Sequence, residues 1–123
     1  MAVKIFLNHT NHPSSKWSVE QISAAKIFGE IVDVPFPNIP PQLDENEVKE
    51  IVAENLQEIL NFSPAVVLCQ GEFNYTFAMV TELKKNNIPV VAATSERIVS
   101  TVIEEDGSSK SISTFRFVRF RNY

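Results

Sequence analysis

Hydrophobic and polar positions along the chain form blocks that predict buried strands separated by amphipathic helices. Short apolar runs at residues 3–7, 30–34, 65–69 and 88–93 predict strands. The runs at 65–69 and 88–93 are apolar on both faces, which is typical of strands in a parallel sheet that is covered on both sides.

The segment at residues 18–28 is predicted to be a helix that ends just before a glycine. Ser18 is followed three residues later by Gln21, which is a capping-box pattern, and Trp17 and Ile22 flank it as a hydrophobic staple. These residues account for the helix start without any ligand.

A second helix begins after Asp44, has Glu47 at the capping-box position and ends before Pro64. Its apolar positions recur at steps of three and four residues, so that one face is apolar throughout: Val48, Ile51, Val52, Leu56, Ile59 and Leu60. A third helix is expected over residues 74–86, with Phe77, Val80 and Leu83 facing inward.

The pattern changes after the fourth strand, where two β-like runs at residues 98–105 and 110–122 flank an Asp-Gly turn. This arrangement is a strong hairpin signal. Strands that alternate with helices predict an α/β fold. We therefore expect a single small Rossmann-like domain over residues 1–123, with a β-α-β-α-β-α-β parallel sheet and a C-terminal β-hairpin.

The last run interleaves Arg116, Arg119 and Arg121 with phenylalanines. A regular strand would place Phe115, Phe117, Arg119 and Arg121 on one face, so the apolar face switches partway. Either a β-bulge or a strand that is buried on one side along only part of its length would explain the switch. Arginines among aromatic residues can bind nucleic acid, or they can pair with acidic side chains or with a second subunit.

Composition narrows the function classes. The chain has 123 residues and a net charge of −4, which argues against a long DNA or RNA footprint or an anionic membrane surface. Its apolar runs are too short for a signal peptide or a membrane span, and we expect a cytoplasmic protein. Cys69 is the single cysteine and is expected to be a buried strand residue.

Polar loops follow three of the predicted strands. In open parallel sheets, ligands bind beyond the carboxyl ends of the strands. The rule selects the loops at residues 8–16 after the first strand, 70–76 after the third and 94–97 after the fourth. Within these loops, the residues expected to bind or act on a ligand are Asn8, His9, Thr10, Asn11, His12, Ser14, Ser15, Lys16, Gly71, Glu72, Phe73, Asn74, Thr94, Ser95 and Arg97. We expect these loops to share one binding rim.

Several residues of this rim have two interpretations. Ser14, Ser15 and Lys16 precede a helix start, where backbone N–H groups suit a phosphate, or they are solvated residues of a turn. Thr94, Ser95 and Arg97 could bind phosphate or ribose oxygens, or form a polar connection into the hairpin. Glu72 could act as a base or a ribose acceptor, or it could be an acid at a helix N-terminus, where it suits the dipole.

Common cofactor motifs are absent, since the chain has neither a G-x-G-x-x-G nor a Walker loop. An ordinary dinucleotide cofactor or an NTPase activity is therefore not expected. His9 and His12 are three residues apart in a loop with no obvious third ligand, so we expect neither a metal nor any other cofactor.

The stretches LNHTNHPSSKW, GEFNYTF and VVAATSER, with the FRFVRFR ending, resemble the small CARF-like accessory proteins of type III CRISPR systems, which include stand-alone ring nucleases. The resemblance covers most of the chain. It implies a homodimer that binds a cyclic oligoadenylate, most readily cyclic tetra-adenylate, with no DNA or membrane partner.

The resemblance also implies a metal-independent reaction, in which a ribose 2′-hydroxyl attacks the adjacent phosphate to give a 2′,3′-cyclic phosphate. On this basis His12 or His9 would transfer protons, and Lys16 and Arg97 would stabilise the phosphate. The alternatives are a protein that binds the same messenger without cleaving it, and a small Rossmann-like enzyme that acts on another nucleotide.

Overall fold

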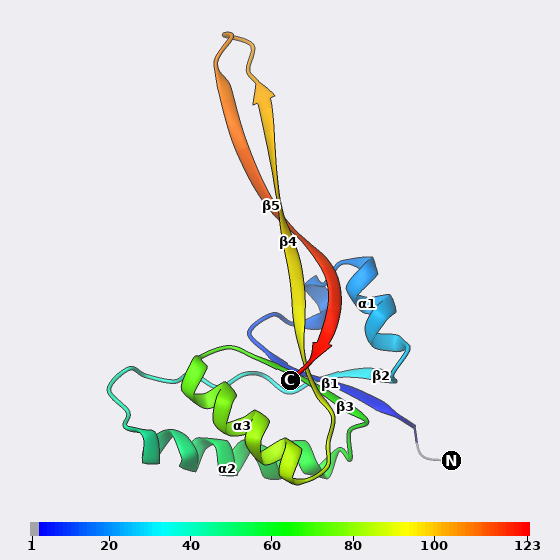
Figure 1. The fold of residues 1–123 in the computed structure, drawn as a ribbon, viewed down its shortest axis with the longest axis vertical. Helices are drawn as coiled ribbons and strands as arrows, with labels where there is room; N and C mark the ends of the chain where they lie inside the picture. The colour runs from blue at the N-terminus through cyan, green and yellow to red at the C-terminus, as the bar shows by residue number, and fades with distance from the viewer. Residues whose placement is uncertain (1–2) are drawn as a thin grey trace.

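The computed structural model describes residues 3–123, and over these residues it shows an α/β fold built on one five-stranded sheet (Figure 1). Met1 and Ala2, which the predicted domain includes, lie outside the described residues. The strands are β1 (Ile5–Thr10), β2 (Glu30–Asp33), β3 (Val66–Gln70), β4 (Val90–Ile103) and β5 (Ser109–Asn122).

The strand order is β2-β1-β3-β4-β5. Strands β2, β1, β3 and β4 are parallel, whereas β5 is antiparallel to β4. The predicted α/β class is therefore confirmed, and the sheet is mixed rather than parallel throughout.

Helices cover both faces of the sheet (Figure 1). Helix α1 (Val19–Lys26), preceded by a short 3-10 turn at Ser14–Lys16, lies on one face and packs its Ala25 against Phe6 and Leu68. Helices α2 (Glu45–Asn61) and α3 (Phe73–Lys85) lie on the other face and form the larger core with residues such as Leu7 and Val67.

The predicted helix starts are confirmed by their hydrogen bonds. The Asp44 carboxylate accepts from the Glu47 backbone N–H, and the Glu47 carboxylate accepts from that of Asp44, which completes the capping box of α2. At α1, the Ser18 hydroxyl accepts from the Gln21 backbone N–H. Helix α1 ends at Lys26, earlier than the predicted position 28.

The prediction that Phe77 faces inward is wrong, because its side chain is 77% exposed. The buried stripe of α3 runs instead through Tyr75, Met79 and Leu83 at four-residue steps, with Val80 beside it. Phe77 lies two residues from both Tyr75 and Met79, which places it on the far side of a helix with 3.6 residues per turn.

Strands β4 and β5 form the predicted hairpin, but it is longer than expected. The register runs from Val91 opposite Asn122 to Ile103 opposite Ser109, with a shift between Thr94 and Ser95. Val118 is the unpaired extra residue at this shift, so of the two explanations for the change of apolar face the structure shows the bulge. Beyond the bulge the hairpin projects from the body of the protein (Figure 1).

Among the described residues, no helix combines the length and the apolar character that crossing a bilayer requires.

Candidate functional site

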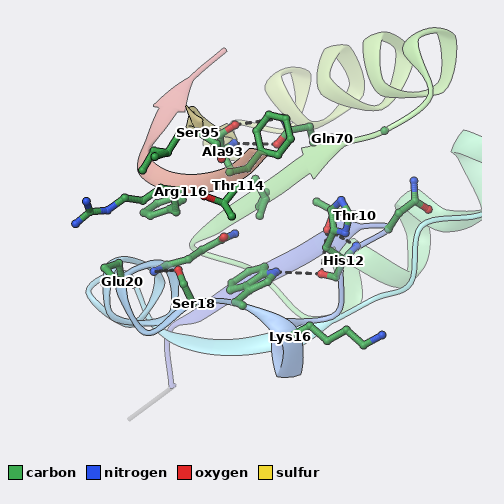
Figure 2. A pocket seen from close by; sticks show the side chains of 18 of the residues that line it. Thr10, His12, Lys16, Ser18, Glu20, Gln70, Ala93, Ser95, Thr114 and Arg116 are labelled. Atoms are coloured by element: carbon green, nitrogen blue, oxygen red, sulfur yellow. Dashed lines mark hydrogen bonds between the residues drawn. The ribbon is translucent and has the colours of Figure 1, made fainter. Parts of the chain in front are cut away.

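A groove of about 1090 Å³ lies where the carboxyl ends of β1 and β3 meet the base of the hairpin (Figure 2). The segment between β1 and α1, together with the first turn of α1, forms one wall, and the hairpin forms the other. The predicted residues that line it are Thr10, Asn11, His12, Lys16, Gly71, Phe73 and Ser95. The structure thus brings together at one rim residues from all three predicted segments.

A hydrogen-bond network inside the protein fixes the loop after β1. The Asn8 side-chain amide donates to the His12 carbonyl at 2.9 Å and to the Asp33 carboxylate at 3.1 Å. The other oxygen of that carboxylate accepts from the backbone N–H and the hydroxyl of Ser14, both at 3.1 Å. Asn8 and Ser14 were predicted to bind ligand, but the structure shows them holding the loop in shape.

His12 is held by its backbone, and its side chain is exposed. Its carbonyl also accepts from the Trp17 indole N–H at 3.0 Å, and its N–H donates to the Thr10 hydroxyl at 3.1 Å. Both His12 and Lys16 have exposed side chains and line the groove. Ser15, which follows in the 3-10 turn, is exposed and does not line it.

The structure separates His9 from the groove. Its side chain is fully buried, and its ring packs against Phe36 and Tyr75 on the face of the sheet that α2 and α3 cover. Nδ1 lies 2.8 Å from the Val34 carbonyl and Nε2 lies 2.6 Å from the Tyr75 hydroxyl. A carbonyl only accepts, so Nδ1 carries the proton and Nε2 accepts from Tyr75.

Burial lowers the pKa of His9 below its ordinary value of 6.5, although the hydrogen bond to the Val34 carbonyl and the negative charge of Glu58 raise it. Burial also raises the pKa of the Tyr75 hydroxyl, which therefore keeps the proton that it donates. His9 is accordingly a neutral core residue that links β1 to α3.

Gln70 holds together β3 and β4 beyond the end of their backbone pairing. Its side-chain oxygen accepts from the Ala93 N–H at 2.9 Å, and its amide donates to the Ala93 carbonyl at 3.2 Å. Glu72 caps α3, since its carboxylate accepts from the Tyr75 N–H at 2.9 Å. Among its three interpretations, the structure therefore assigns it the helix-terminus role, and neither Glu72 nor Asn74 lines the groove.

The predicted loop after the fourth strand does not exist, because β4 continues without interruption from Val90 to Ile103. Pairing with β5 keeps these residues extended. The Thr94 hydroxyl donates to the Arg119 carbonyl, and the Arg97 guanidinium donates to the Ser113 hydroxyl at 2.9 and 3.1 Å. Of the three, only Ser95 lines the groove; Thr94 and Arg97 are occupied by cross-strand hydrogen bonds.

The hairpin wall of the groove was missed as a binding surface. It consists of Ile98, Thr114, Phe115, Arg116 and Phe117. Trp17, Glu20, Gln21 and Gln70 also line the groove and were not predicted to bind ligand. The arginine–phenylalanine alternation was the available signal, but which of these side chains face the groove depends on the bulge register.

Charge in the groove favours an anion. Lys16 and Arg116 line it from opposite walls and their charged ends extend outward at its edges (Figure 2), and Glu20 is the single carboxylate among the lining residues. Among residues 3–123, no three His, Cys, Asp or Glu side chains cluster closely enough to hold a metal ion. Cys69 is buried as predicted, and burial raises the pKa of its thiol to about 12.

Comparison with known proteins identifies a family. Over 92 residues the chain is 32% identical to the Uncharacterized protein MJ1673 of Methanocaldococcus jannaschii. This alignment covers 70% of the chain and 66% of that protein. The match thus spans just under two-thirds of the relative's length. No solved structure gives a significant match. Residues 4–121 match the Uncharacterized protein MJ1673 family, and the chain belongs to that family.

Proposed function

We propose that the groove binds a cyclic oligoadenylate, most readily cyclic tetra-adenylate. The observation that carries the proposal is a groove of about 1090 Å³ with cations on opposite walls. Pockets for drug-sized ligands are about 300–1,000 Å³, so a groove slightly larger than this range suits a ligand larger than one nucleotide. In this proposal, phosphates on different sides of one ring contact Lys16 and Arg116.

Aromatic side chains in the groove supply surfaces for adenine. Phe73 is 90% exposed and Phe115 is 75% exposed, and both line the groove. Stacking of a base on an aromatic ring contributes roughly 1–3 kcal/mol per base. Ser95 and Asn11 offer polar groups to ribose and phosphate oxygens, whereas the Thr10 hydroxyl is already bonded to Asn8 and His12.

The proposal also includes a more specific fold than the α/β class. Four parallel strands with helices on both faces and a groove at their carboxyl ends support a small Rossmann-like, CARF-like domain. In this proposal the domain acts in the cytoplasm, on a soluble messenger.

Cleavage of the ring is a second proposed activity, and the exposed imidazole of His12 at the rim favours it. A ribose 2′-oxygen would bond to the adjacent phosphorus as the bond from phosphorus to the next 5′-oxygen breaks. The 2′-proton would pass to His12, and the leaving 5′-oxygen would take a proton from water. The product is a linear oligoadenylate with a 2′,3′-cyclic phosphate and a 5′-hydroxyl.

Incubation with labelled cyclic tetra-adenylate and cyclic hexa-adenylate, with and without EDTA, tests both proposals when bound ligand and products are measured. Linear products in EDTA that disappear in His12→Ala, while binding persists, support cleavage. Tight binding of an intact ring supports a sensor or a protein that sequesters the messenger. The absence of any binding contradicts the proposed function.

Lys26 provides a matched control because it is an exposed lysine of α1 that does not line the groove. Charge-assisted hydrogen bonds contribute about 1.5–3 kcal/mol, so Lys16→Ala should weaken binding about tenfold or more. Lys26→Ala should leave it unchanged. Equal effects from both lysines would indicate only general charge attraction.

A further inference from the structure

Three carboxamide side chains line the groove, and the structure leaves them with different capacities for hydrogen bonding. They belong to Asn11, Gln21 and Gln70. The carboxamide of Gln70 is occupied, because its oxygen and its nitrogen both bond to the backbone of Ala93. Asn11 is exposed, so water competes for its carboxamide. Gln21 is half-buried, and among residues 3–123 its carboxamide has no hydrogen-bond partner.

Gln21 occupies the position at which a capping box would use its side chain. In α2 the box is complete, because the carboxylates of Asp44 and Glu47 each accept from the backbone N–H of the other residue. In α1 only half of the box forms within the described chain. The Ser18 hydroxyl accepts from the Gln21 backbone N–H, and no bond returns from the Gln21 carboxamide to Ser18. The backbone of Gln21 therefore completes the helix start, and its side chain stays available to the groove.

Trp17 lines the same wall of the groove as Gln21, and its ring is fixed from two directions. The indole N–H donates to the His12 carbonyl at 3.0 Å, and the indole ring is nearly perpendicular to the ring of Phe6, at a centroid distance of 6.3 Å. Bases stack on aromatic side chains of every orientation that leaves a face open to the ligand. A base that enters beside Gln21 therefore meets an aromatic ring that is already held in place.

We propose that Gln21 distinguishes adenine from other purines in the groove, an inference that rests on the proposed binding of a cyclic oligoadenylate. The amide nitrogen of Gln21 donates to N7 of adenine, and its amide oxygen accepts from the 6-amino group, which is the pairing that glutamine makes with adenine at this edge. Guanine and hypoxanthine carry an oxygen at position 6, so the same edge offers two acceptors and the Gln21 oxygen has no donor. Glu20 cannot make this pair, because a carboxylate only accepts.

Titration of cyclic tetra-inosinate, in which hypoxanthine replaces every adenine, tests the inference beside cyclic tetra-adenylate. A bidentate pair gives roughly 5- to 100-fold discrimination, so the wild type should bind the adenine ring at least about fivefold more tightly. Gln21→Met keeps the length of the side chain without a donor or a strong acceptor, and it should bind the two rings with similar affinity. Gln57→Met, at an exposed position of α2 outside the groove, should keep the wild-type preference.

The results separate the role of Gln21 from the proposed function. If the wild type binds neither ring, both are overturned. If the wild type binds the two rings equally well, or if Gln21→Met keeps the full preference for the adenine ring, only the role of Gln21 is overturned. A preference that is lost in Gln21→Met and kept in Gln57→Met supports both.

A second ligand tests which edge of the base is read, and it needs only the wild-type protein, so it decides the question even if Gln21→Met fails to fold. The ring built from 7-deaza-adenosine keeps the 6-amino group and lacks the N7 acceptor. The wild type should bind this ring at least about fivefold more weakly than cyclic tetra-adenylate, because the Gln21 amide nitrogen loses its partner. Equal affinity for the two rings would overturn the assignment of Gln21 to this edge of adenine.

Discussion

The buried hydrogen bond between Tyr75 and His9 makes a sharp test of how the core is held together. Tyr75→Phe removes one hydroxyl and leaves the ring, which packs against Phe36 at a centroid distance of 4.8 Å. Both partners of the lost 2.6 Å hydrogen bond are fully buried, so no water replaces the donor at His9 Nε2.

Leaving a buried acceptor unpaired costs about 1–3 kcal/mol, and this is the expected loss in the free energy of unfolding. For a chain of this size, 1 kcal/mol corresponds to about 4 °C in Tm, so we expect Tm to fall by about 4–12 °C. Urea unfolding should show a lower midpoint at an unchanged m value.

Tyr123→Phe is the matched control. The Tyr123 hydroxyl donates to the Cys69 carbonyl at 2.7 Å, but its side chain is 44% exposed and water can take its place. We expect this variant to lose about 1 kcal/mol or less. A loss below about 0.5 kcal/mol in Tyr75→Phe, or one no larger than in Tyr123→Phe, would refute the account of this core.

Three further predictions concern groups that shape the same fold. Because the pKa of His9 is lowered in the folded state, its contribution to stability is complete above about pH 6.5 and is lost as the pH falls toward the folded pKa, by up to about 1.4 kcal/mol per pH unit. In urea titrations at a series of pH values, the free energy of unfolding of His9→Gln should therefore depend less steeply on pH than that of the wild type. The same pH dependence in both proteins would contradict this. Asp33→Ala should raise amide exchange rates in the loop after β1, measured by hydrogen exchange, and lower stability by about 1 kcal/mol, since three hydrogen bonds disappear; unchanged rates would show that the loop is held otherwise. Gly29→Ala should lower Tm, because a Cβ atom there would collide with the backbone carbonyl of Lys4, and calorimetry that shows an unchanged Tm would contradict the tight packing.

Local chemistry predicted the helix starts and the order of the elements as far as the fourth strand, which continues into the hairpin instead of ending before it. Asp44 and Glu47 act through bonds within one turn, and Asp-Gly defines a turn by its own conformational preferences, so sequence alone is sufficient. His9 was predicted to lie at the rim because it follows an apolar run. The structure continues β1 to Thr10, which turns His9 toward the core, where Tyr75 and Val34 supply its partners.

The binding surface was predicted only in part for a related reason. Polarity suggested a loop at residues 94–97, yet pairing with β5 overrides polarity and extends the strand. Arg116 and Phe115 enter the groove through a register that the bulge at Val118 sets. The alternation of apolar and polar residues within one strand does not predict such long-range pairing with another strand.

Calorimetric titration of cyclic tetra-adenylate into the protein tests the proposal that the groove binds a cyclic oligoadenylate. We expect saturable binding by the wild type and a loss of affinity of at least a hundredfold in the double variant Lys16→Ala, Arg116→Ala, since each cation contributes about tenfold or more. Lys26→Ala should bind like the wild type. No heat of binding in the wild type, or equal affinity in the double variant, would show that the groove does not bind this ligand.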